Sequence, residues 1–191
     1  MTTPVPVGGF PAPDMLVDLP LGEVYGFLEP GPVVLLTTRR GERANVMTMS
    51  WHMMVEFVPP RIACVVSDAD HSAAALTVTG ECVIAIPPAD LLAGVVAIGN
   101  SSGRSEDKFA AFGLTPLAAE TVAAPLIGEC FVDLECRVID SSLADRFGIR
   151  VLEVIKAWRN PAVDDTRTLH HRGHGVFAVD GETIRTASRM P

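Results

Sequence analysis

The sequence predicts a mainly β fold of the α+β type, in which six or more antiparallel strands form a barrel with a few short helices between them. Two observations support this prediction. Several short runs alternate apolar and polar residues with a period of two, which is the pattern of half-buried strands. Turn residues such as glycine, proline and aspartate separate these runs. Closure into a barrel is an economical way to hide the edges of so many strands.

The individual elements follow from the same patterns along the chain. Residues 1–20 are rich in proline and predict an extended arm, and residues 21–191 are expected to form a single domain. We expect helices over 22–28, 89–98 and 106–112, and a further short helix that ends at Gly80. We expect strands over 33–39, 45–60, 61–67, 82–86, 130–138, 149–158, 176–179 and 183–186, with Asp180-Gly181 as the turn of a C-terminal hairpin.

The stretch 45–60 carries the clearest alternation in the chain. One face of this expected strand is apolar, and the other carries hydroxyl and imidazole groups instead of Lys or Glu. Such a polar face can form several hydrogen bonds at fixed spacing, either with a ligand or with solvent and neighbouring groups. The apolar face comprises Met47, Met49, Trp51 and Met53, and the polar face comprises Thr48, Ser50 and His52.

Composition and charge exclude several classes of function. The 191 residues carry a formal net charge of -8, which argues against nucleic acid as a partner because such binding needs a basic surface. Two prolines and an aspartate interrupt the most apolar stretch, 82–99, so no membrane span is expected. The N-terminus lacks a basic flank before an apolar segment, so we expect no signal peptide and a cytoplasmic location. The cysteines form no close pair and are expected to be buried, reduced thiols: Cys64, Cys82, Cys130 and Cys136.

Two segments place polar residues ahead of a helix, where free backbone N–H groups can bind an anion. The first is the turn from Ser67 to Ser72, and the second is the loop over 101–108, which contains two basic residues. Each segment also has a simpler interpretation. Asp70 or Ser72 can cap the first helix, and Ser105 can cap the second, without any ligand.

Several short motifs occur in order between residues 31 and 138. In this order they resemble the flavin reductase-like, FMN-binding split-barrel family, and its flavoredoxin-type members in particular. Each motif is weak alone, whereas the N-x-M-T-x-S-W strand followed by a D-K-F helix start is fairly specific. The motifs are Pro32-Val33-Val34, Asn45-x-Met47-Thr48-x-Ser50-Trp51, Pro59-Pro60, Ser67-x-x-x-His71-Ser72 and Ser105-x-Asp107-Lys108-Phe109.

The resemblance implies a six-stranded antiparallel Greek-key barrel that works as a homodimer and binds FMN near the subunit interface. Asp70 departs from the family, which has a basic residue before the turn histidine, and Ala73 adds no hydroxyl. The flavin would be lined by Asn45, Met47, Thr48 and Ser50, with Trp51 matching the motif but sharing the apolar face of the strand. The ribityl and phosphate region would comprise Ser67, His71, Ser72, Ser102, Arg104, Ser105 and Lys108.

The implied activity is that of an oxidoreductase in which NAD(P)H passes a hydride or electrons through bound FMN. The alternative is a non-enzymatic FMN-binding protein or electron carrier. NADH and NADPH are equal alternatives, and the electrons would pass to a monooxygenase or another acceptor protein. Hydride transfer to a flavin needs no acid–base residue, so no catalytic residue is assigned, and His52 is only a candidate for contact with substrate.

Three histidines near the C-terminus, His170, His171 and His174, raise the question of a metal site. They could align on one ion only in a helix, and Gly173 and Gly175 disfavour a helix there. We therefore expect no metal. The segment is interpreted as one that covers the mouth of the cofactor site or whose histidines face water.

Overall fold

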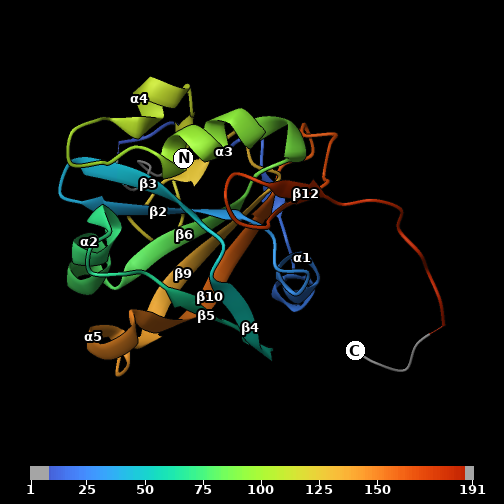
Figure 1. Ribbon diagram of the computed structural model, residues 1–191, viewed down its shortest axis with the longest axis horizontal. Helices are drawn as coiled ribbons and strands as arrows, with labels where there is room; N and C mark the ends of the chain where they lie inside the picture. The colour runs from blue at the N-terminus through green and yellow to red at the C-terminus, as the bar shows by residue number, and fades with distance from the viewer. Residues whose placement is uncertain (1–8, 188–191) are drawn as a thin grey trace, which may run out of the picture.

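The computed structural model describes residues 9–187, and its body is one eight-stranded sheet in which all pairs are antiparallel (Figure 1). The mainly β prediction is confirmed, although the sheet has more strands than the six implied by the resemblance. Along the sheet the order is β3 (Arg43–Met49), β2 (Val34–Arg40), β6 (Glu81–Ile86), β9 (Val132–Asp140), β10 (Ile149–Arg159), β5 (Pro60–Val65) and β4 (His52–Phe57), and β1 (Val17–Asp18) pairs with β10.

Short helices cover the sheet near β2 and β3. Figure 1 shows α3 and α4 above β3, and α2 beside the β2–β3 hairpin. None of the helices between residues 9 and 187 is long and apolar enough to cross a membrane. The helices are η1 (Leu21–Glu23), α1 (Tyr25–Leu28), α2 (His71–Thr79), η2 (Ala89–Leu91), α3 (Leu92–Gly99), α4 (Lys108–Phe112) and α5 (Ala144–Phe147). Two small sheets complete the fold, formed by β7 (Pro116–Leu117) with β8 (Leu126–Ile127) and by β11 (Leu169–His171) with β12 (Phe177–Val179).

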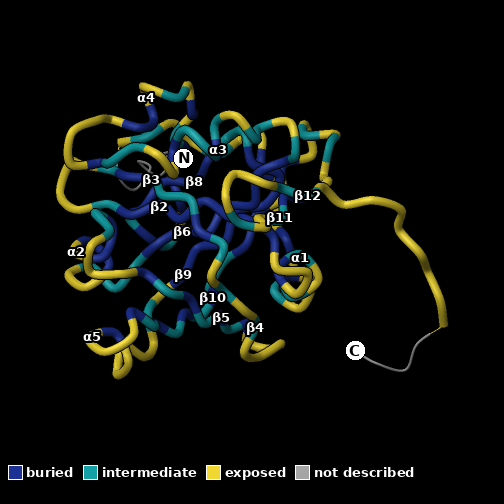
Figure 2. The backbone as a smooth tube through the Cα atoms, viewed as in Figure 1, coloured by how far each residue is buried: buried dark blue, intermediate teal, exposed yellow. Residues whose placement is uncertain are grey.

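Both faces of the central strands are buried along most of β6 and over the first five residues of β2 and β9 (Figure 2). Leu36 and Leu134 pack in the cluster inside the barrel, and Leu35 packs with Ile98 between the sheet and the helices. This double burial explains why β6 and the start of β2 have nearly continuous apolar sequences. The four cysteines are buried and form no disulfide, as expected.

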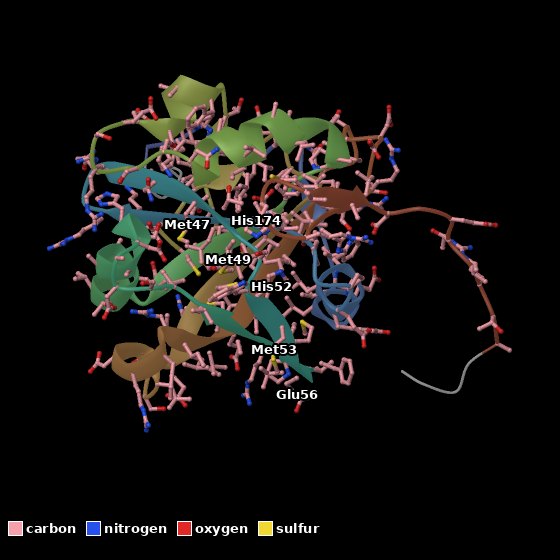
Figure 3. All side chains as sticks on the ribbon, viewed as in Figure 1. Met47, Met49, His52, Met53, Glu56 and His174 are labelled. Carbon is pink, nitrogen blue, oxygen red and sulfur yellow. The ribbon has the colours of Figure 1, made fainter. Side chains whose placement is uncertain are left out.

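The expected strand over 45–60 is two strands, and this corrects the predicted apolar face. The chain leaves β3 at Ser50 and joins β4 at the opposite end of the sheet, across the split in the barrel (Figure 3). Met49 is 4% exposed at the end of β3, whereas Trp51 and Met53 are 72% and 62% exposed. Alternation continues in the sequence, but the core lies on only one side of the break, so Trp51 turns to the surface.

The C-terminal hairpin also differs from its prediction. β12 pairs with β11, and residues 183–186 form no strand. The Asp180 carboxylate accepts hydrogen bonds from the backbone N–H and the hydroxyl of Thr168, at 3.0 and 2.6 Å. Asp180 therefore anchors β11 instead of starting a turn with Gly181.

The predicted N-terminal arm is partly joined to the sheet. Val17 and Asp18 pair with the end of β10, and Leu16 and Leu19 are buried. Residues 1–8 of the arm lie outside the described residues. The division of the chain at residue 20 stays a prediction.

Candidate functional site

The first cavity of the site lies where β3, the turn before α2 and the loop between α3 and α4 meet. We call it the basic cavity, because Arg104, Lys108 and His71 line it together with Gly99 and Gly103. Its volume is about 140 Å³. It brings together most of the residues that the sequence motifs predicted as a binding site: Asn45, Met47, Thr48, His71, Ser72, Ser102, Arg104 and Lys108.

Hydrogen bonds between side chains and neighbouring elements hold these walls in place. The Asn45 amide on β3 donates to the Ser72 hydroxyl on α2 at 2.9 Å, and the Thr48 hydroxyl donates to the Val95 carbonyl of α3 at 2.6 Å. The Lys108 ammonium is buried and donates to the Ile98 carbonyl at 2.8 Å. Burial lowers the pKa of Lys108, while the charges of nearby acidic groups oppose that shift. One of its three ammonium hydrogens is used by Ile98, which leaves donors for a ligand.

The first turn of α2 faces the basic cavity without a side-chain cap. Asp70 is at the N-cap position, but its carboxylate accepts a hydrogen bond from the Ser67 backbone N–H at 2.9 Å instead of from the helix. The Ser72 hydroxyl accepts from Asn45, so neither expected capping residue fills that role. Backbone N–H groups at the start of this nine-residue helix are therefore available to an anion.

Ser105 does not cap the second helix either. Asp107 occupies that position, and its carboxylate accepts from the backbone N–H groups of Phe109 and Ala110. The Ser105 hydroxyl donates to the Ser102 carbonyl in its own turn. The first backbone N–H groups of α4 are thus hydrogen-bonded to a carboxylate of the protein itself.

Arg43 is a cationic residue beside the basic cavity that the sequence motifs did not include. Its guanidinium donates to the Gly103 carbonyl at 2.6 Å, and the Arg104 guanidinium donates to the Ala69 carbonyl at 3.0 Å. Burial lowers the pKa of His71, and the charges of Arg43, Arg104 and Lys108 lower it further. A neutral histidine among these cations marks a region of positive potential. The available signal was the period of two, which puts Arg43 on the same face of β3 as Asn45.

Gly103 is required where the loop closes over β3. A Cβ atom at this position would collide with the side-chain oxygen of Asn45 and with the His71 ring. Only glycine lets the backbone approach both groups so closely. The loop over 101–105 can therefore form one wall of the basic cavity.

A second cavity, of about 310 Å³, adjoins the basic cavity through the shared residues Thr48 and Gly99. We call it the mixed cavity, because apolar and polar side chains line it. Its apolar wall includes Val33, Val95 and Phe177, and its polar groups include Ser50, Asn100 and His171. His171 and Gly175 come from the β11–β12 hairpin, which therefore forms part of this cavity's wall, consistent with a segment covering a site.

Four residues considered from the sequence lie outside both cavities: Trp51, Ser67, Ser105 and His52. The Ser67 hydroxyl accepts from the Ala69 backbone N–H within its own turn. His52 forms a 2.7 Å hydrogen bond through Nε2 with the Pro32 carbonyl, and burial lowers its pKa. Its other ring nitrogen is buried and has no hydrogen-bond partner among residues 9–187.

The terminal histidines have separate environments. His170 Nε2 lies 2.8 Å from an Asp180 carboxylate oxygen. The His171 ring packs against the Phe177 ring, with the two ring centroids 5.0 Å apart. Among residues 9–187, no three His, Cys, Asp or Glu side chains converge as metal ligands would.

The profile of the flavin reductase like domain matches residues 27–177. The chain belongs to this family. The resemblance inferred from the ordered motifs is thereby confirmed, and the flavin reductase-like chain has the antiparallel split-barrel fold of the family.

Known relatives extend over nearly the whole flavin reductase-like chain. YddH, an uncharacterized protein of Escherichia coli K12, is 31% identical over 182 residues, which cover 88% of this chain and 96% of YddH. The FMN-binding domain of a flavin reductases-like enzyme from Shewanella baltica OS155 superposes with a TM-score of 0.83 at 24% identity, covering 90% of this chain and 97% of that one. Flavoredoxin of Desulfovibrio vulgaris (Miyazaki F) gives a TM-score of 0.75 at 25% identity, covering 83% and 91%.

Proposed function

We propose that the chain binds FMN, with the phosphate in the basic cavity and the ring system in the mixed cavity, and that NADH or NADPH reduces the bound flavin. The observation that carries this proposal is the junction of the two cavities at Thr48 and Gly99. One end of the joined site is cationic, and the other has apolar walls with a few polar groups. That division matches a ligand with an anionic phosphate and a flat, largely apolar ring. The FMN-binding domain from Shewanella baltica has the same fold.

The donors of the basic cavity fit a phosphate monoester, which is about doubly negative near neutral pH. Lys108 and Arg104 supply positive charge, Ser102 supplies a hydroxyl, and the start of α2 supplies backbone N–H groups. Charge-assisted hydrogen bonds of this kind hold phosphates without a glycine-rich fingerprint. Asp70 adds a carboxylate to the wall, so Lys108 and Arg104 carry the greater part of the attraction.

The residues of the mixed cavity would hold and orient the ring. Val33, Val95 and Phe177 provide apolar contact, and Ser50 and His171 provide hydrogen-bonding groups at the edges. FMN, when bound, supplies a ring that accepts a hydride directly, so the chain's own contribution is position, electrostatics and exclusion of water. No residue of this wall has to exchange a proton for that transfer.

We also propose that two copies associate through β4. This strand is at one end of the sheet, and four apolar side chains on it or just before it are exposed: Trp51 by 72%, Met53 by 62%, Val55 by 50% and Phe57 by 41%. A contiguous apolar face on an edge strand is unfavourable in water and is covered in stable proteins. Trp51 follows Ser50, which lines the mixed cavity, so a second copy would lie close to that cavity. Sedimentation should show a dimer that Met53→Glu dissociates, and a monomeric wild type would contradict this proposal.

The test of function is the absorption spectrum of the protein after FMN is added and unbound FMN is removed. Retained flavin bands that bleach with NADH or NADPH under anaerobic conditions would support the proposed oxidoreductase. Flavin bands that neither nicotinamide bleaches would favour the electron carrier or storage protein instead. Absence of flavin bands, together with no binding heat on titration with FMN, would refute the proposal.

A further inference from the structure

His52 is a half-buried histidine that lines neither the basic cavity nor the mixed cavity. Figure 3 shows it at the start of β4, where the chain has just left β3. Pairing with Cys64 of β5 fixes its backbone. The imidazole therefore extends from a strand that is held within the main sheet, and its contacts decide what it can do.

The imidazole uses one of its two nitrogens. Nε2 lies 2.7 Å from the Pro32 carbonyl oxygen, and a carbonyl can only accept, so Nε2 carries the hydrogen and donates it. Burial lowers the pKa of His52 and thereby favours the neutral ring, in which Nδ1 is an acceptor. This acceptor is buried and unpaired among residues 9–187, which costs free energy. An apolar side chain would avoid that cost, so the bond to Pro32 is what histidine contributes at this position.

The acceptor of this bond belongs to a peptide group that also holds the β11–β12 hairpin. The peptide between Pro32 and Val33 is one rigid planar unit, in which the carbonyl and the N–H point in opposite directions. The carbonyl accepts from His52, and the Val33 N–H donates to the Leu169 carbonyl of β11 at 2.6 Å. Hydrogen bonds that share a peptide group polarise and strengthen each other. His52 is thus connected to the hairpin through a single peptide.

The same peptide lies at the wall of the mixed cavity. Val33 lines this cavity, and so do His171 and Phe177 of the hairpin. β11 and β12 pair with each other, and within residues 9–187 neither strand pairs with the main sheet. The bond from Val33 to Leu169, together with the burial of the Leu169 side chain, therefore fixes where the hairpin stands relative to the main sheet.

We propose that His52 is a positioning residue for the wall of the mixed cavity. Its Nε2–H fixes the peptide between Pro32 and Val33, and that peptide places both the Val33 side chain and the hairpin against the bound ring. The proposal rests on the proposed function, because FMN is the ligand whose affinity reports on this wall. His52 itself exchanges no proton in the reaction and acts only through these neighbours.

The experiment compares His52→Phe with His52→Gln in the full chain. Phenylalanine keeps a planar ring and removes the donor, whereas the amide nitrogen of glutamine can donate from nearly the place of Nε2. The readouts are hydrogen exchange of the Val33 amide in the FMN-free protein and the Kd for FMN from calorimetric titration. We expect His52→Phe to speed that exchange and to raise Kd by about twofold to tenfold, the range for one neutral hydrogen bond. His52→Gln should keep both quantities near their wild-type values.

Thr37→Val is the matched control. It removes a bond of the same kind from β2, because the Thr37 hydroxyl donates to the Pro125 carbonyl at 2.6 Å, and Thr37 lines neither cavity. This variant should lower the stability of the free protein and leave the Kd for FMN unchanged. Equal effects of Thr37→Val and His52→Phe on Kd and on Val33 exchange would overturn the proposal, as would an unchanged Val33 exchange in His52→Phe.

Failure of this proposal is distinguishable from failure of the proposed function. If the wild type binds no FMN, the proposed function is refuted, and Val33 exchange in the FMN-free variants still decides whether His52 positions the wall. If the wild type binds FMN and His52→Phe binds it equally well, the positioning role alone is refuted. Should His52→Phe fail to fold, His52→Asn takes its place, because its amide is one methylene shorter than that of glutamine and falls short of the Pro32 carbonyl.

Discussion

Lys108 offers the sharpest perturbation of the basic cavity, because its ammonium lies in the cavity wall and has one internal acceptor. Replacement by methionine keeps an unbranched side chain of similar length and removes the charge. If the ammonium meets the FMN phosphate, the lost charged hydrogen bond weakens binding by about 1.5–3 kcal/mol, or about tenfold to a hundredfold in Kd. The Ile98 carbonyl also loses its 2.8 Å donor, so the free energy of unfolding should fall by about 1 kcal/mol.

The matched control is Lys156→Met, at the other lysine of the chain. Lys156 lies on β10 and pairs with the carboxylates of Asp18 and Glu120 at 2.6 and 3.2 Å, away from both cavities. Calorimetric titration with FMN gives Kd for each variant, and urea unfolding of the free protein gives stability. Equal FMN affinity in the two variants would show that the Lys108 ammonium does not meet the phosphate and would remove the basic cavity as the phosphate site.

Three other variants test separate parts of the account. Gly103→Ala should lower the free energy of unfolding by about 1–3 kcal/mol and weaken FMN binding, because the new Cβ has no room. The control is Gly26→Ala, where a Cβ meets nothing within 4 Å. Equal unfolding curves for the two variants would contradict the close contact at Gly103. Thr48→Val removes the donor to the Val95 carbonyl, so it should lower the free energy of unfolding by about 0.5–1.5 kcal/mol and also weaken FMN binding. Loss of flavin with unchanged unfolding would instead show that the hydroxyl serves the ligand alone. Burial raises the pKa of Asp133 well above its usual range, so the folded state keeps a proton that the unfolded state releases, and stability should decline as pH rises above the ordinary value near 3.8. Asp133→Asn should flatten that decline in urea unfolding, and an unchanged slope would be contrary evidence.

The binding motifs were predictable because each is local. Asn45 and Thr48 lie on one strand, on its opposite faces, and His71 and Lys108 begin helices, so residue type and local position mark them as donors. Their convergence in one cavity came from the resemblance to a known family, since nothing in the spacing brings residue 45 near residue 108. Arg43 was missed because an arginine next to a hairpin turn usually faces solvent.

The errors arose where distant contacts decide local structure. The alternation through Ser50 and Trp51 predicts one strand, but the chain crosses from one end of the sheet to the other at that point. Asp180-Gly181 is a strong turn signal, yet the Asp180 carboxylate bonds to Thr168. The alternation over 130–138 gives no sign that Glu135 is fully buried and accepts from the Trp158 indole N–H at 2.7 Å. A period of two identifies faces of a strand but does not say what covers them.

The most direct measurement of the central claim is the ratio of dissociation constants for riboflavin and FMN, obtained by calorimetric titration of the same preparation. The two ligands share the ring and differ by the phosphate, so the ratio isolates the contribution of the basic cavity. The account predicts that FMN binds about a hundredfold more tightly or better, as two or more charged hydrogen bonds would give. Equal affinities for riboflavin and FMN would contradict it.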